Sequence, residues 1–156
     1  MDGSVFVDHE DRWILGLRGL TVTRIGVDHQ LSLGLGVDAW LTLEGPCWLT
    51  DGSAGKDGRQ ETVVPERQDV AAALALFGAM AMSAVAFKTG SLRLVFDNGI
   101  RLECRADPSF EAWQMTGPEG RCFASLPGGA LAVWSGTRTA PGSEEALRSR
   151  TVRGDL

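Results

Sequence analysis

Residues 91–104 read SLRLVFDNGIRLEC, and this stretch decides the fold. On both sides of Asp97-Asn98-Gly99, large apolar residues alternate with polar ones, so that one set of side chains lies on the buried face of a sheet. Asn-Gly between two such runs favours a two-residue type I′ turn, because both residues tolerate positive φ. The stretch therefore predicts an antiparallel β-hairpin.

The same alternation occurs earlier in the chain, between residues 12 and 49. Four apolar positions there align with four of the later stretch at a constant offset of 61 residues: Leu31, Leu33, Leu35 and Leu41 with Leu92, Leu94, Phe96 and Leu102. Alternating leucines also align by chance in β-rich chains, so duplication and coincidence both stay open. Either way, two similar hairpins are predicted.

A helix is expected over residues 65–81, between the two hairpins. Pro65 suits the first helical turn, and Glu66 and Asp69 complement the positive end of the helix dipole. From residue 70 the sequence VAAALALFGAMAM is apolar on almost every side, which a helix lying on a surface cannot be. We expect this helix to be buried, either between the two hairpin halves, which we favour, or against a second copy.

The predicted fold class is therefore α+β: mainly antiparallel β-hairpins packed around one apolar helix. Residues 1–11 are polar and acidic with one short apolar patch, and are predicted to form a loose leader or a first edge strand. Residues 12–136 are expected to form a single α+β domain, a length sufficient for an independent core. Residues 137–156 have few large apolar residues and are predicted to be a flexible tail.

Composition argues against several partners. The formal net charge is −5, and the arginines are scattered singly along the sequence, so no nucleic-acid partner is expected. The longest apolar stretch, residues 70–82, is shorter than the roughly 20 residues of a spanning helix, so no membrane span is expected. The two histidines, His9 and His29, lie in polar segments, and neither a metal site nor a cofactor is predicted.

The three cysteines, Cys47, Cys104 and Cys122, are odd in number and far apart in sequence. Their spacing matches neither a disulfide framework nor a zinc site. We expect reduced, unpaired thiols and a cytoplasmic location.

The segment from Asp107 to Trp113 contains the candidate binding residues Phe110, Glu111 and Trp113. If Asp107-Pro108 begins a helical turn, Phe110 and Trp113 share one face. If the segment is extended, Glu111, Trp113 and Met115 share a face instead. Both arrangements put a carboxylate near an indole, which forms either a ligand-binding wall or a buried core contact, and we favour the core contact.

The chain resembles a family of small domains of unknown function that is common in actinobacteria. The resemblance covers roughly residues 12–136 and rests on turns and core positions: Leu20 to Val22 with the Leu31 strand, Trp48 to Gly52, Gly90 to Gly99, Phe110 to Trp113 with Gly117-Pro118, and Pro127 to Trp134. Phe110 stands where the family is expected to have tyrosine, and residues 104–106 depart from a more proline-rich pattern. The family carries no established catalytic residues, so the resemblance implies no activity.

Two functions are compatible with the sequence. The first is a non-enzymatic protein-interaction module that binds another protein or itself. One version of it is an immunity-type protein that neutralises a toxin by binding it, since the chain also resembles immunity proteins more distantly. The second is a small-molecule-binding protein or hydrolase with a pocket near Glu111 and Trp113. We favour the first, because binding requires no convergent catalytic set.

Overall fold

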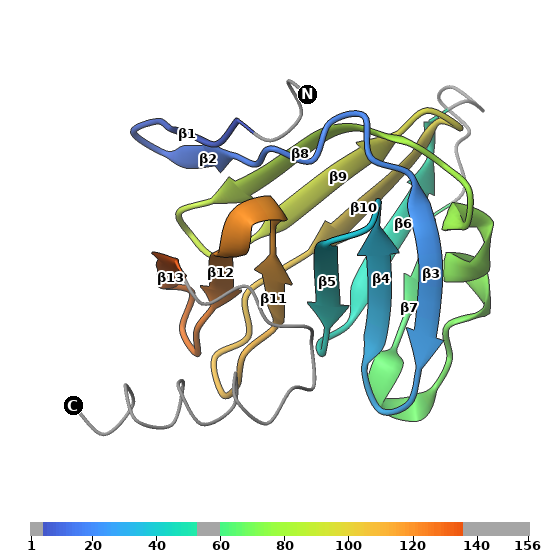
Figure 1. Ribbon diagram of the computed structural model, residues 1–156. Coiled ribbons are helices and arrows are strands. Elements are labelled where there is room, and N and C mark those ends of the chain that lie inside the picture. The colour runs from blue at the N-terminus through green and yellow to red at the C-terminus, as the bar shows by residue number, and fades with distance from the viewer. Residues whose placement is uncertain (1–4, 53–59, 136–156) are drawn as a thin grey trace.

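Two antiparallel β-sheets pack face to face in the computed structural model, which describes residues 5–52 and 60–135 (Figure 1). The seven-stranded sheet has, in spatial order, β1 (Val7–Asp8), β2 (Arg12–Ile14), β8 (Ala81–Phe87), β9 (Leu92–Phe96), β10 (Ile100–Cys104), β6 (Cys47–Asp51) and β7 (Gln60–Val63). The six-stranded sheet has β13 (Leu131–Ser135), β12 (Arg121–Ser125), β11 (Trp113–Thr116), β5 (Ala39–Leu43), β4 (Leu31–Leu35) and β3 (Val22–Val27).

The core lies between the two sheets and is built from the alternating positions of the strands. Leu31, Leu33 and Leu35 of β4 face it, as do Leu92 and Leu94 of β9, and each is at most 1% exposed. Burying a leucine side chain contributes about 1.5–3 kcal/mol relative to leaving it in water. The period-two pattern is therefore stabilised by sheet-on-sheet packing.

The predicted hairpin around Asp97-Asn98-Gly99 is confirmed, since β9 pairs with β10 directly across it. The predicted turn type is wrong, because Gly99 has a φ of 89° while Asn98 is not among the described residues with positive φ. The Gly99 amide donates to the Phe96 carbonyl at 3.0 Å, as in a three-residue loop that ends on a left-handed glycine. The Asp97 carboxylate accepts from the Met80 amide, and the Asn98 carboxamide donates to the Ala75 carbonyl. These bonds tie the turn to residues 75–80.

The predicted α+β fold with a helix over residues 65–81 is wrong, because the fold is mainly antiparallel β. Two short 3₁₀ turns, η3 (Pro65–Arg67) and η4 (Ala71–Leu76), occupy the first part of that range. η4 ends at Leu76, because Phe77 already has an extended backbone with a φ of −62° and a ψ of 128°. Gly78 follows with a φ of 84°, and β8 begins at Ala81. Figure 1 shows η4 as a short green coil beside β3.

Burial across this segment follows a period of three, the repeat of a 3₁₀ helix. Val70, Ala73, Leu76 and Ala79 are at most 7% exposed. Phe77, expected in the core, is 62% exposed. Residues 70–82 form one continuous apolar run, which is why they resemble a buried α-helix. The run in fact joins a 3₁₀ turn to the start of a strand, and the buried positions of these two elements have different periods.

The two predicted hairpins lie at equivalent places in the two sheets. Leu33 of β4 pairs with Leu41 of β5, and Leu94 of β9 pairs with Leu102 of β10, so the offset of 61 residues recurs in the pairing. The irregularities in strand pairing also match. The pairing register of β3 with β4 shifts opposite residues 34–35, and that of β8 with β9 shifts opposite residues 95–96, which are again 61 positions later. This equivalence favours duplication over coincidence.

Strands β3, β4 and β5 form one three-stranded meander, and β8, β9 and β10 form a second. Each meander is extended by a hairpin from the other half of the chain. β6 follows β5 in sequence but pairs with β10, and β11 follows β10 but pairs with β5. Each hairpin is completed by its next strand, β7 or β12. The halves are therefore joined by main-chain hydrogen bonds in both sheets.

Gly99→Val should destabilise the fold by roughly 1–3 kcal/mol, because a β-branched residue is strained at positive φ. Urea unfolding measures the change. Gly26→Val is the matched control, since Gly26 lies within β3 outside the positive-φ set and an added Cβ meets the Ser32 Cβ at an ordinary 3.6 Å. Equal unfolding midpoints for Gly99→Val and wild type would reject the left-handed turn.

Candidate functional site

The three candidate binding residues lie in different environments. The Asp107 carboxylate accepts from the Ser109 and Phe110 amides at 2.7 and 3.3 Å, and this turn leads the chain toward β11. Phe110 is 51% exposed, Glu111 is half-buried and Trp113 is fully buried. Phe110 and Trp113 therefore do not form one accessible wall.

Trp113 is a core residue in the extended arrangement, on the same buried face as Met115. Its indole N–H donates to the Gly90 carbonyl at 2.9 Å, and the buried Ser125 hydroxyl donates to the same oxygen at 2.8 Å. Each buried polar group is thereby satisfied. The indole contributes to packing and to this bond rather than to a surface exposed to ligand.

Gly90 also fixes the loop between β8 and β9 against the loop between β12 and β13. A Cβ added to Gly90 would lie 2.6 Å from the Gly129 carbonyl oxygen, and one added to Gly129 would clash with the Thr89 carbonyl oxygen. Both glycines have positive φ. This end of the β-sandwich is thus closed by backbone packing that admits no side chain.

The three cysteines are unpaired, as predicted. Cys47 and Cys104 are buried and lie opposite each other in the β6–β10 register, whereas Cys122 is partly exposed. A hydrogen bond with the Cys104 thiol, together with burial, raises the pKa of Cys47 well above its ordinary value. Cys47 therefore stays protonated and unreactive near neutral pH.

Thiol reactivity should separate these positions. In the native protein Cys122 should react first with a disulfide reagent, and Cys47 and Cys104 should react only on unfolding, because Cys47 and Cys104 are buried whereas Cys122 is partly exposed. Spectrophotometric titration under denaturing, non-reducing conditions should then find all three thiols. Cys122→Ser is the control that should remove the fast phase. A total of one thiol in the wild type would mean an intramolecular disulfide and would contradict the unpaired assignment.

No group of three or more histidine, cysteine, aspartate or glutamate residues within residues 5–52 and 60–135 is placed to hold a metal ion. No helix there is long and apolar enough to cross a membrane.

The outward face of the seven-stranded sheet carries a set of residues that sequence reasoning missed. Strand alternation puts Leu92, Leu94 and Phe96 in the core, so Arg93 and Val95 point outward. On the same outward side lie the residues that define what we call the Arg–aromatic face: Arg12, Trp48, Phe87, Arg93, Arg101 and, directly after β10, Arg105.

Guanidinium groups stack on the aromatic rings of this face. The Arg12 and Arg93 guanidinium carbons lie 5.0 and 5.2 Å from the centroid of the Phe87 ring. The Arg105 guanidinium carbon lies 5.0 Å from a Trp48 ring centroid. Such cation–π contacts contribute about 0.5–1 kcal/mol each at exposed sites and hold the long side chains against the sheet.

Apolar side chains lie between these stacked pairs. Val85 of β8 is directly opposite Ile14 of β2 and Arg93 of β9, and Val95 lies opposite Ser83 and Arg101. Val85 is only 6% exposed although it points away from the core, so its neighbours on the face cover it. The face is therefore an apolar sheet surface overlaid by arginine and aromatic side chains.

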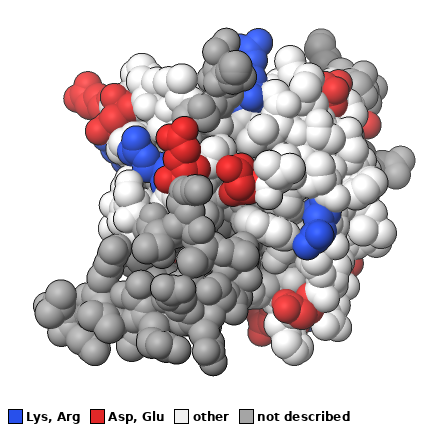
Figure 2. Space-filling model, in the orientation of Figure 1, with Lys and Arg blue, Asp and Glu red and all other residues white. Residues whose placement is uncertain are grey.

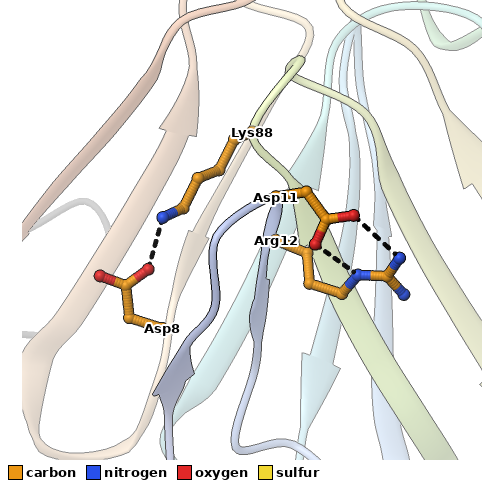
Figure 3. A network of polar contacts seen from close by, with 4 residues as sticks. All are labelled: Asp8, Asp11, Arg12 and Lys88. Carbon is orange, nitrogen blue, oxygen red and sulfur yellow. Dashed lines mark hydrogen bonds and ion pairs between the residues drawn. The ribbon is translucent and has the colours of Figure 1, made fainter.

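Carboxylates partner some of the cations at the β1–β2 end of the face (Figure 3). The Arg12 guanidinium donates two hydrogen bonds to the Asp11 carboxylate, each of 3.1 Å. These bonds lower the pKa of Asp11 below its ordinary value. Lys88 pairs with Asp8 beside them, and Figure 3 shows the two ion pairs pointing in different directions. Arg12 is thus partly neutralised.

The outward face of the six-stranded sheet differs in character. Small or uncharged side chains occupy one row across its strands: Gly26, Ser32, Thr42, Gln114, Ala124 and Ala132. The neighbouring row includes Arg24, whose guanidinium carbon lies 5.6 Å from the Trp40 ring centroid. Figure 2, seen from this side, is largely white over β3, β4 and β5. Arg24 and Trp40 therefore form a single arginine–aromatic pair beside this row, whereas the outward face of the seven-stranded sheet has three arginine–aromatic contacts among its described residues.

These features define an antiparallel two-sheet β protein with one arginine-rich, aromatic sheet face. The chain belongs to the family of unknown function DUF6188, whose model matches residues 13–135, from within β2 to the last residue of β13. This agrees with the resemblance to a family of unknown function. No curated protein and no solved structure matches the chain.

Proposed function

We propose that this protein is a non-enzymatic interaction module that binds a partner protein through the Arg–aromatic face. The observation that carries the proposal is the stacking of Arg12 and Arg93 on Phe87 and of Arg105 on Trp48. Arginine and aromatic residues are enriched at protein interfaces and dominate their binding energy. Stacking restricts the arginine side chains before binding, which reduces the entropy lost on association.

The shape of the surface also favours a protein partner. The face spans neighbouring strands of one sheet, whereas a small molecule usually needs a concave pocket that covers most of its surface. The second function predicted from the sequence, a pocket near Glu111 and Trp113, has less support because the Trp113 indole is fully buried and bonded to Gly90. Masking of a partner, as in immunity proteins, is the version of the proposal that best fits a small binding domain. The unpaired thiols fit a cytoplasmic setting.

Trp48→Ala should weaken capture of the partner from the native host by roughly thirtyfold or more, because truncating an aromatic anchor of an interface costs about 2 kcal/mol or more of binding free energy. The measurement is affinity capture with quantitative mass spectrometry, scored for a stoichiometric partner that wild type retains. Trp40→Ala is the matched control, since Trp40 also lies under an arginine but on the other sheet.

Far-UV circular dichroism and thermal unfolding establish that both variants remain folded. Equal capture by Trp48→Ala and wild type, or loss of the partner only in Trp40→Ala, would overturn the proposed face. Absence of any stoichiometric partner for the wild-type chain would overturn the interaction function itself.

A further inference from the structure

Positive charge is concentrated on the Arg–aromatic face although the chain as a whole is acidic. The formal net charge of the chain is −5. Among the described strand residues that point outward from β2, β8, β9, β10 and β6, the cations are Arg12, Arg93 and Arg101, and the single carboxylate is Glu103. Arg105, next after β10, adds a further cation. The acidic groups of the chain therefore lie mainly elsewhere.

The arginines of this face are separated in sequence and are brought together by strand pairing. β9 and β10 are neighbours, with Glu103 opposite both Arg93 and Trp48. Neighbouring strands lie about 4.8 Å apart, so these cations are spaced within reach of several carboxylates on one partner surface. The Arg101 guanidinium is 4.0 Å from Glu103, an exposed contact that restrains it weakly.

The guanidinium groups of Arg93 and Arg105 lie over aromatic rings, with their central carbons 5.2 Å from the Phe87 centroid and 5.0 Å from a Trp48 ring centroid. A guanidinium group has five N–H donors in a planar fork that matches the two oxygens of a carboxylate. Each of these cations therefore stands beside an apolar ring, a combination that suits a partner surface with both carboxylates and apolar groups.

The positive charge of the Arg–aromatic face also disfavours binding of a second copy of the chain through the same face. Two identical faces brought together would place arginines against arginines, and like charges across an interface cost binding free energy. An acidic surface would instead gain pairing with the arginines and cover Phe87, Val95 and Trp48. This argument rests on the proposed function, because it assumes that the face binds a protein.

We propose that the partner is an acidic protein whose carboxylates pair with Arg93, Arg101 and Arg105 and whose apolar groups cover Phe87 and Trp48. Recognition is by guanidinium–carboxylate hydrogen bonds at β9 and β10 and by burial of the aromatic rings that flank them on β8 and β6. Binding is consequently sensitive to ionic strength, because these charges are exposed before association.

The test uses the full chain and a random copolymer of glutamate and tyrosine, which supplies both carboxylates and aromatic groups. Titration followed by amide chemical shifts should map binding to β8, β9, β10 and β6. Arg93→Glu/Arg105→Glu should weaken binding by at least about tenfold, because attraction is replaced by repulsion at two sites. Arg93→Gln/Arg105→Gln should fall between this variant and wild type.

Arg18→Glu/Arg24→Glu is the control with the same change of net charge, since Arg24 lies on the other sheet and Arg18 is exposed in the turn between β2 and β3. It should retain binding to within about twofold, the change expected from long-range charge alone at physiological salt. Thermal unfolding of all variants excludes loss of the fold as the cause.

Three outcomes would overturn the acidic-partner assignment: no binding of the copolymer at low salt, equal weakening by both charge-reversal pairs, or tighter binding of oligothymidylate than of the copolymer. The last result would indicate a nucleic acid. These results are separable from the proposed function, because a host protein captured by wild type and lost in Trp48→Ala would still establish the face as a protein-binding site with other chemistry.

Discussion

The exchange of hairpins between the two halves of the chain is the constraint on which the rest of the structure depends. β6 and β11 each leave the meander that precedes them and pair with the third strand of the other meander. Each sheet therefore contains main-chain hydrogen bonds between residues that are more than 50 positions apart, such as Leu49 and Leu102. Neither half of the chain can supply, with its own strands, the hydrogen-bonding partners that β5 and β10 find in the other half.

The same exchange assembles the Arg–aromatic face from both halves. Trp48 comes from the first half and lies opposite Glu103 of the second, and Arg105 stacks on the Trp48 ring. On the inner side of the same two strands, Cys47 and Cys104 meet in the core. One pairing thus closes the core on one face of the sheet and builds the candidate binding surface on the other.

Local sequence predicted the strands well and the connecting segment poorly. Alternation around Asp97-Asn98-Gly99 identifies the hairpin because turn and strand signals lie within a few residues of each other. The turn type was missed because Asp97 and Asn98 bond to residues 75–80, a contact that sequence spacing does not reveal. The segment from Val70 to Ala81 combines two backbone periods in one apolar run, which is why it was predicted as one helix.

The binding surface could not be predicted, for a different reason. Arg93 and Arg105 are isolated in the sequence, and only the register of β9, β10 and β6 brings them to one face with Trp48 and Phe87. Of the candidate binding residues that the local sequence suggests, Trp113 belongs to the core. Charge that is dispersed in a sequence can therefore be concentrated by long-range pairing.

Complementation of two fragments tests this account most directly. Residues 1–77 and 78–156, divided at the exposed Phe77-Gly78 connection, should each fail to give a cooperatively unfolding monomer. Mixed or co-expressed, they should form a one-to-one complex with the far-UV circular dichroism spectrum of the intact chain, as measured together with sedimentation. If either fragment folded alone as a stable monomer, the two halves would not depend on exchanged strands, and the account would be contradicted.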